Sequence, residues 1–293
     1  MDYTAFAKCR EHFFKEWPLA FAECDVKKPE KSPKVSLRDH LVRVADLTKL
    51  IIEERFTLRV LHGLLPELFA GIDALNLAYV IGLLHDLGKA SKYYIESFTG
   101  KAGSRLGFPY HELSIPLHMF HAAQSSSELD EQSLAAIHIV AKVISRHHSA
   151  MPGRHPLELG GVPDLLRRSV EGLCDERVAK FVDELRKSCN SSFCNLIMEV
   201  LTRHLYSEEC RKVHTYISIY TLKELAGFKG LWGLPRVNEY AVYRVVAVLT
   251  GVLIVADNVV ASYEGRESDD KITRLYVKYW TQELSRVLDR WLK

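Results

Sequence analysis

The chain has 293 residues, of which 47% are hydrophobic and 26% are charged. This is the composition of a globular protein with enough apolar material for a sizeable core. The formal net charge of +2 gives no global sign of a nucleic-acid partner, which would need basic residues gathered locally. The six cysteines contain no CxxC pair, which excludes a zinc ribbon and a thioredoxin-like motif, and reduced thiols are expected.

Nothing in the sequence indicates a membrane protein. The first twenty residues carry charges throughout and have no apolar core of the kind found in secretory signals. The longest apolar run, residues 245–256, is shorter than the roughly twenty residues that span a bilayer as a helix. We therefore expect a soluble, cytoplasmic protein with no membrane partner.

Apolar residues recur at helical spacing along most of the chain. In chain order, this spacing predicts helices over residues 37–55, 73–87, 133–148, 239–262 and 271–292. Ser36 is suited to cap the first of them. Residues 97–110 and 150–165 are rich in glycine and proline and are predicted to be loops, whereas residues 166–215 are predicted to be helical and charge-rich. Because no sustained period-two alternation appears, the predicted fold class is all-α.

No convincing linker or internal repeat divides the chain. We expect a single domain over residues 1–293, with a helical elaboration at about 150–235.

The strongest chemical signal is LLHDLGKAS at residues 83–91. A hydrophobic helix ends there by presenting His85 and Asp86 side by side, where charge is normally scarce. Adjacent helical residues point about 100° apart, so the two side chains can wrap around one ion, or Asp86 can bridge two. An isolated His-Asp pair would more simply be a chance histidine beside a capping aspartate.

A second signal is the pair His147 and His148, which follows the apolar face of the helix over 133–148. Buried imidazoles need partners, so two consecutive histidines at a helix end are harder to dismiss than one. The other histidines show no such signal. His118 and His204 are predicted to be unremarkable, and His138 is predicted to lie on the polar side of its helix.

Asp257 follows a run of twelve residues without a charge, on a helix that reads as buried. A carboxylate there is costly unless it is ion-paired or bound to metal, and an ion pair is the simpler alternative. His40, near the start of the first helix, and His111, after the loop over 97–110, are each weak signals alone.

Together these positions predict a metal site between helix ends. Imidazoles with carboxylates are the ligands of Mn, Fe, Co, Ni or Zn rather than of Mg alone. Seven ligands exceed what one such ion needs, so we expect two divalent transition-metal ions with a bridging aspartate, with Mg also possible. The ligands are His40, His85, Asp86, His111, His147, His148 and Asp257.

The order of these residues, H…HD…H…HH…D, resembles that of the HD phosphohydrolase superfamily. Residues 31–47, residues 82–91, HELS at 111–114, ISRHH at 144–148 and ADNVVAS at 256–262 resemble one branch in particular. That branch is the HD nuclease of type I CRISPR systems, in its stand-alone form without the helicase.

The resemblance implies an HD-domain helical bundle with two half-sites. His40, His85, Asp86 and Asp257 would hold one metal, and Asp86 would bridge to a second metal held by the remaining ligands, His111, His147 and His148. Asp86 and Lys89 would be catalytic, with Lys89 reaching the phosphate or stabilising developing charge. Ser262 would form a hydrogen bond to the ligands from outside the coordination sphere.

The resemblance further implies a hydrolase that cuts single-stranded DNA in antiviral defence by a two-metal hydroxide mechanism. Its partners would be single-stranded DNA, a separate CRISPR-associated helicase and the RNA-guided surveillance complex. The basic residues nearest the motifs, as candidate contacts to nucleic acid, are Lys31, Lys34, Arg38 and Arg146. Two other functions stay open: an HD phosphohydrolase that acts on a small nucleotide, and a metal-binding subunit that only docks partners.

Overall fold

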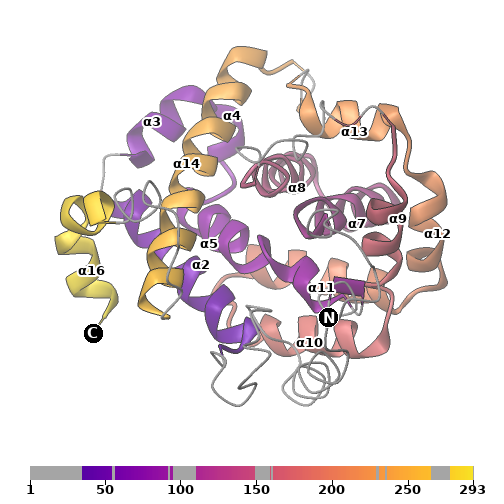
Figure 1. Ribbon diagram of the computed structural model, residues 1–293. Helices are drawn as coiled ribbons and strands as arrows, with labels where there is room; N and C mark the ends of the chain where they lie inside the picture. Colours follow the sequence, from indigo (N-terminus) through magenta and orange to yellow (C-terminus); the bar gives the residue numbers. More distant parts are fainter. Residues whose placement is uncertain are drawn as a thin grey trace, which may run out of the picture.

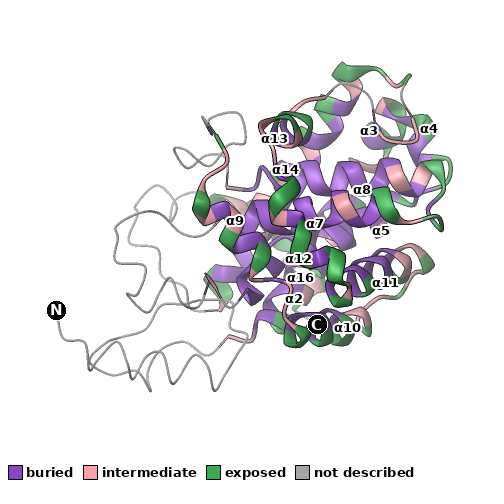
Figure 2. Cartoon of the chain, turned by 90° about the vertical axis from the view of Figure 1, so that its right-hand side faces the viewer, coloured by how far each residue is buried: buried purple, intermediate pink, exposed green. Residues whose placement is uncertain are grey.

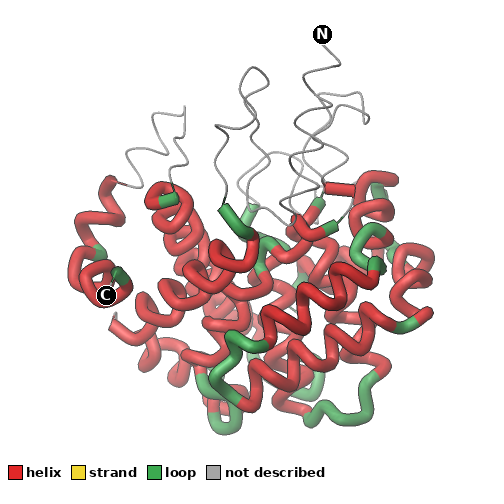
Figure 3. The backbone as a smooth tube through the Cα atoms, turned by 90° about the horizontal axis from the view of Figure 1, so that it is seen from below, coloured by secondary structure: helices red, strands yellow, loops and turns green. Residues whose placement is uncertain are grey.

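The computed structural model describes residues 35–54, 57–91, 93–94, 110–148, 159, 161–228, 231–234, 236–264 and 278–292. Every regular element in these ranges is a helix, as the tube in Figure 3 shows. Leu231 and Leu234 form an isolated bridge, and no strand is present in the described ranges. The predicted all-α fold class is therefore confirmed.

The helices follow one another with short connections. In chain order they are α2 (Leu37–Glu54), α3 (Thr57–Leu64), α4 (Pro66–Phe69), α5 (Ala74–Leu84), the 3-10 helix η2 (Leu87–Ala90), α7 (His111–Ser125), α8 (Glu131–Ile144), α9 (Asp164–Glu171), α10 (Glu176–Arg186), α11 (Ser192–Tyr206), α12 (Glu208–Tyr216), α13 (Ile219–Ala226), α14 (Glu239–Tyr263) and α16 (Ser285–Trp291).

Helix α5 is the centre of the bundle. Asp73 caps it by accepting a hydrogen bond from the backbone N–H of Leu75, and every residue from Leu77 to Leu84 is buried. A helix that is apolar all round must be covered on every side. Figure 1 shows α5 between α2 and α14 on one side and α7 and α8 on the other.

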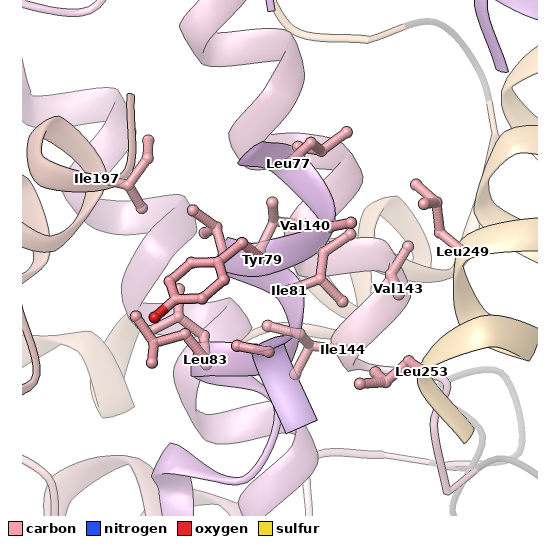
Figure 4. Packing of buried hydrophobic residues seen from close by; sticks show 14 of the residues in the cluster. Leu77, Tyr79, Ile81, Leu83, Val140, Val143, Ile144, Ile197, Leu249 and Leu253 are labelled. Atoms are coloured by element: carbon pink, nitrogen blue, oxygen red, sulfur yellow. The ribbon is translucent and has the colours of Figure 1, made fainter. Parts of the chain in front are cut away.

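The core forms where these central helices meet. Figure 4 shows Ile81 of α5, Val143 of α8 and Leu253 of α14 facing one another, and all three side chains are buried. The outer helices bury only one face, which the burial colouring of Figure 2 makes visible on α10 and α12. Packing on α5 therefore fixes where the helices that carry the predicted ligands end.

Helix α14 is long and apolar enough, by length and composition alone, to cross a membrane. One such helix is weak evidence, because the core helix of a globular bundle meets the same criterion. Here α14 packs on α2 and α8 and buries Leu249 and Leu253 in the core. Its apolar character is thus explained by the bundle itself.

Several predicted boundaries shift by a few residues. The helix predicted over 133–148 is α8, which starts at Glu131 because Asp130 caps it, and ends at Ile144. The helix predicted over 271–292 is described only from residue 278, and its side chains Leu284 and Leu288 are buried. Most of the two predicted loops lies outside the described residues.

Two predictions about individual side chains are wrong. His138 is buried, not on a polar face, and it accepts a hydrogen bond from the backbone N–H of Trp232. The structure also joins Cys174 to Cys210 and Cys189 to Cys194 in disulfides, where reduced thiols were expected. The contacts of His138 and of Cys174 join segments 94 and 36 positions apart, which helical spacing does not report.

Candidate metal centre

Four helix ends and the interior of α14, which carries Asp257, converge on one polar cluster within the core. His85 is the C-cap of α5 and Asp86 follows it, while His111 is the first residue of α7. His40 lies in the first turn of α2, and the pair after α8 supplies two more imidazoles. All seven predicted ligands are brought together, from segments up to 217 positions apart in the sequence (257 − 40).

The first half-site consists of two imidazoles and two carboxylates. The Nε2 atom of His40 lies 3.3 Å from Asp257 Oδ1 and 3.7 Å from Asp86 Oδ2. The Nε2 atom of His85 lies 3.4 Å from Asp86 Oδ2 and 3.7 Å from Asp257 Oδ1. These four donor atoms lie within 4.8 Å of one another, which is the spacing of ligands around one ion.

The second half-site uses the other oxygen of the same aspartate. Asp86 Oδ1 lies 3.0 Å from His111 Nε2 and 3.4 Å from His147 Nε2. His148 completes the group, with its Nε2 atom 3.1 Å from His111 Nε2. Asp86 therefore presents one oxygen to each half-site, which is the position of a bridging ligand between two ions.

The orientation of the imidazoles fits metal binding. The Nδ1 atom of His85 lies 2.7 Å from the carbonyl of Gly82, and that of His147 lies 2.6 Å from the carbonyl of Ile144. Each carbonyl can only accept, so Nδ1 donates its proton there and Nε2 is the nitrogen left to bind a metal ion. Both Nε2 atoms are buried and form no hydrogen bond with a described residue. Histidines that bind metals are held in this way.

The buried carboxylates of the centre also favour the binding of a cation. Burial alone lowers the pKa of His40, but the carboxylates of Asp257, Asp86 and Glu264 outweigh it and raise that pKa to about 10. Burial likewise opposes protonation of His85, whose pKa is nevertheless raised to about 8 by Asp86 and Asp257. In the absence of metal, protons are thus drawn to the nitrogens where a divalent ion would bind.

Lys89 lies in the centre as predicted. It follows Asp86 by three residues on η2, is almost fully buried, and pairs through Nζ with Asp86 Oδ2. Burial opposes ionisation of Asp86, but the charges of Lys89 and His85 hold the pKa of this carboxyl well below its usual range. The ammonium group is thus adjacent to any phosphate bound beside Asp86.

The prediction for Ser262 is wrong, and Glu264 takes the role assigned to it. Ser262 is exposed on the last turn of α14. Glu264, the C-cap of the same helix, buries its carboxylate and accepts a hydrogen bond of 2.8 Å from His40 Nδ1. Arg43 pairs with its other oxygen at 3.1 Å. In the sequence, Glu264 begins a polar stretch, so no local signal distinguishes it.

The candidate contacts to nucleic acid are only partly described. Lys31 and Lys34 lie outside the described residues, and Arg38 is exposed on α2. The prediction for Arg146 is wrong, because its guanidinium group is buried and donates to the carbonyls of Lys142 and Leu225. It holds α13 to α8 and does not face solvent. A further buried carboxylate, Glu112, lies beside His111 and was not predicted.

Replacing Glu264 with glutamine is expected to weaken metal binding about 10- to 100-fold, as is usual for partners outside the coordination sphere. The amide no longer draws the Nδ1 proton of His40 as a carboxylate does. Metal affinity measured by competition with a chromophoric chelator tests this. Glu239→Gln, at the exposed other end of α14, is the matched control. Equal affinities in the two variants would contradict the role of Glu264.

Metal binding is expected to release protons at neutral pH. At pH 7 both His40 and His85 hold a second proton, because their pKa values are raised to about 10 and about 8. At pH 9 His85 has lost that proton and His40 has not, so fewer protons are released. Calorimetric titration in two buffers of different ionisation enthalpy measures this number. No release at pH 7 would show that these nitrogens do not bind the ion.

The family model described as HD domain matches residues 37–213, which include every candidate ligand except Asp257. No curated protein and no solved structure matches the chain significantly. The matched segment covers more than half of the chain, and the structure adds Asp257 to the same cluster. The chain belongs to the HD-domain family of metal-dependent phosphohydrolases.

Proposed function

We propose that this protein is a metal-dependent nuclease that hydrolyses phosphodiester bonds of single-stranded DNA in CRISPR antiviral defence. The observation that carries the catalytic part of this proposal is the position of Asp86. Its two oxygens face two different sets of imidazoles, at 3.4 Å from His85 and 3.0 Å from His111. A carboxylate in this position is typical of two-metal phosphoesterases.

The donor set predicts Mn, Fe, Co or Ni at both half-sites, with Mg also possible. When bound, two such ions clamp a phosphate and activate water for attack in line with the leaving oxygen. The protein itself then has three tasks. The locked imidazoles fix the ligand positions, Asp86 sets the spacing between the half-sites, and Lys89 places a positive charge beside the bound phosphate.

The substrate and the biological setting rest on sequence resemblance. The segments at residues 31–47, 144–148 and 256–262 resemble those of stand-alone CRISPR HD nucleases, which work with a separate helicase and an RNA-guided surveillance complex. Among the predicted contacts to nucleic acid, Arg38 is available on the surface two residues before His40. This location favours a strand that approaches along the first turn of α2.

A small nucleotide is the second candidate substrate. It is favoured by the depth of the centre, because His40 and His85 have no exposed surface and Asp257 exposes only 14% of its side chain. A site of this depth accepts a phosphate at the end of a small molecule more easily than one within a polymer strand. The two candidates call for the same metals and the same ligands.

The test is hydrolysis by metal-stripped protein resupplied with Mn, Mg, Co, Ni or Zn. Labelled single-stranded DNA, double-stranded DNA and nucleotides serve as substrates. Metal-dependent cutting of single strands, lost in Asp86→Ala and His148→Ala and kept in the exposed control His62→Ala, supports the proposal. Hydrolysis of nucleotides without cutting of DNA would support the second candidate substrate instead. Metal binding without any turnover contradicts both.

Replacing Lys89 with methionine is expected to lower kcat about 10²- to 10³-fold, the usual cost of losing a group that stabilises developing charge. Metal affinity should not fall, because the lysine competes with the ion for Asp86 Oδ2. Steady-state kinetics and metal titration of the same variant test both parts. Lys212→Met, on the exposed face of α12, is the control. A loss of metal binding in Lys89→Met would contradict this assignment.

A further inference from the structure

A second cluster of histidine and cysteine lies apart from the HD centre. His118 is in the middle of α7, and His204 is in the last turn of α11. Cys174 follows α9, and Cys210 is in the first turn of α12. Both imidazoles and Cys210 are buried, and Cys174 is partly buried.

The four side chains converge from four different elements. The Nδ1 atom of His118 lies 3.1 Å from His204 Nε2 and 3.8 Å from Cys210 Sγ. The donor atoms of His118, Cys174 and Cys210 lie within 4.8 Å of one another. Ser207 sets the spacing of the last two elements, because it ends α11 and its hydroxyl accepts from the N–H of Cys210 to start α12.

The two separations from His118 are close to those in a tetrahedral zinc site. With Zn–N near 2.0–2.1 Å and Zn–S near 2.3 Å, the edges of such a tetrahedron are about 3.4 Å between nitrogens and about 3.6 Å between nitrogen and sulfur. The observed values are 3.1 Å for His118 to His204 and 3.8 Å for His118 to Cys210. The two sulfurs, which are bonded to each other in the structure, would have to separate, and His204, which lies outside the group of donor atoms within 4.8 Å of one another, would have to move toward them.

The protonation of the imidazoles suits ligands as well. His118 Nε2 lies 2.9 Å from the carbonyl of Val170, so Nε2 carries the proton and Nδ1 presents its lone pair to the cluster. Burial lowers the pKa of His118 to about 4 and that of His204 to about 3, which keeps both neutral at pH 7. Two thiolates would neutralise Zn²⁺ completely, so the filled site carries no net charge into the interior.

We propose that His118, Cys174, His204 and Cys210 form a Cys2His2 site for structural zinc when the two cysteines are reduced. Each thiol gives up one proton to become a thiolate ligand. From the disulfide, a dithiol or phosphine reductant must first add two electrons and two protons, and is itself oxidised. Zinc and the disulfide are mutually exclusive, because both use the same two sulfur atoms. With four protein ligands, the site is closed and has no position for a substrate.

The position of the site gives it a structural role. Zinc there would tie α7 to α11, α12 and the segment after α9, two turns along α7 from His111. The helix that supplies a ligand to the HD centre would thus be anchored by an additional ion outside that centre. The Cys189–Cys194 disulfide, between the end of α10 and the start of α11, provides a matched control pair.

Cobalt titration of the full chain under a phosphine reductant tests the proposal. The HD centre offers only nitrogen and oxygen ligands, so a thiolate-to-cobalt absorption band in the near ultraviolet reports the second site alone. The expected result is a band whose final intensity corresponds to one thiolate-bound cobalt per chain, whatever cobalt the HD centre also binds. It should disappear in the double variant Cys174→Ser with Cys210→Ser, and persist in Cys189→Ser with Cys194→Ser. Absence of the band in the reduced protein, or its persistence in the first variant, overturns the proposal.

X-ray absorption of the zinc-loaded wild-type protein tests the same ligands without any substitution. It therefore still decides the question if the first variant fails to fold. With the HD centre occupied by manganese, the zinc spectrum is expected to show two sulfur and two nitrogen neighbours. A zinc spectrum with nitrogen and oxygen neighbours only overturns the proposal. Neither result depends on hydrolytic activity, so the zinc site and the proposed function are tested independently.

Discussion

Replacing Asp86 with alanine is expected to lower metal-dependent hydrolysis by at least about 10³-fold. This exceeds the 10- to 100-fold typical of a partner outside the coordination sphere, because one residue is lost from both half-sites at once. Its Oδ2 atom lies 3.4 Å from His85 Nε2, and its Oδ1 atom lies 3.4 Å from His147 Nε2. No neighbouring carboxylate can take both positions, since Asp257 contacts only the first half-site.

The number of bound ions distinguishes the bridging role from a general loss of charge. Asp257→Asn is expected to impair the first half-site and leave the second able to bind its ion. Asp86→Ala is expected to weaken both. Asp183→Ala, whose side chain is half exposed on α10, should bind metal like the wild type. If Asp86→Ala and Asp257→Asn lose the same single ion, Asp86 is not a bridging ligand.

Replacing Gly82 with alanine is expected to destabilise the protein by about 2–3 kcal/mol, at the upper end of the usual cost of overpacking. A Cβ atom at Gly82 would lie 2.5 Å from Ala45 Cα and 2.8 Å from Ala45 N. These are backbone atoms of α2, so no side chain can move aside. Helices α2 and α5 must separate, and they carry His40 and His85, whose rings lie 5.5 Å apart.

The matched control for this prediction is Gly251→Ala. Gly251 is also inside a helix, but no atom lies within 4 Å of the position that its Cβ would take. Alanine there should stabilise the protein by about 0.5–1 kcal/mol, because glycine is a poor helix former. Urea denaturation of the metal-free variants measures both effects. Equal midpoints for the two variants would show that α2 and α5 are not in close contact at Gly82.

The helices could be predicted because their signals are local. The apolar spacing of α2, α5 and α14 is set by residues three and four positions apart, and their caps lie at their own ends. The candidate ligands were visible for a related reason. His85 and Asp257 are polar residues at positions where a buried helix should be apolar, which is costly without a partner.

The remaining features depend on contacts that no local pattern reports. Glu264 is one of several acidic residues in a polar stretch until α14 delivers it to His40, 224 positions away. His118 and Cys210 appear ordinary in sequence because their partners lie on other helices. Arg146 adjoins the histidine pair in sequence, yet its side chain turns away to the carbonyls of α13. Tertiary packing alone decides these three cases.

The central claim is that two half-sites share Asp86, and anomalous diffraction from crystals grown with manganese tests it most directly. The account predicts two manganese peaks, separated by about 3.5–4 Å. One should lie among His40, His85 and Asp257, and the other among the three remaining histidines, with Asp86 between them. A single peak, or two peaks that do not share Asp86 as a ligand, would contradict the account.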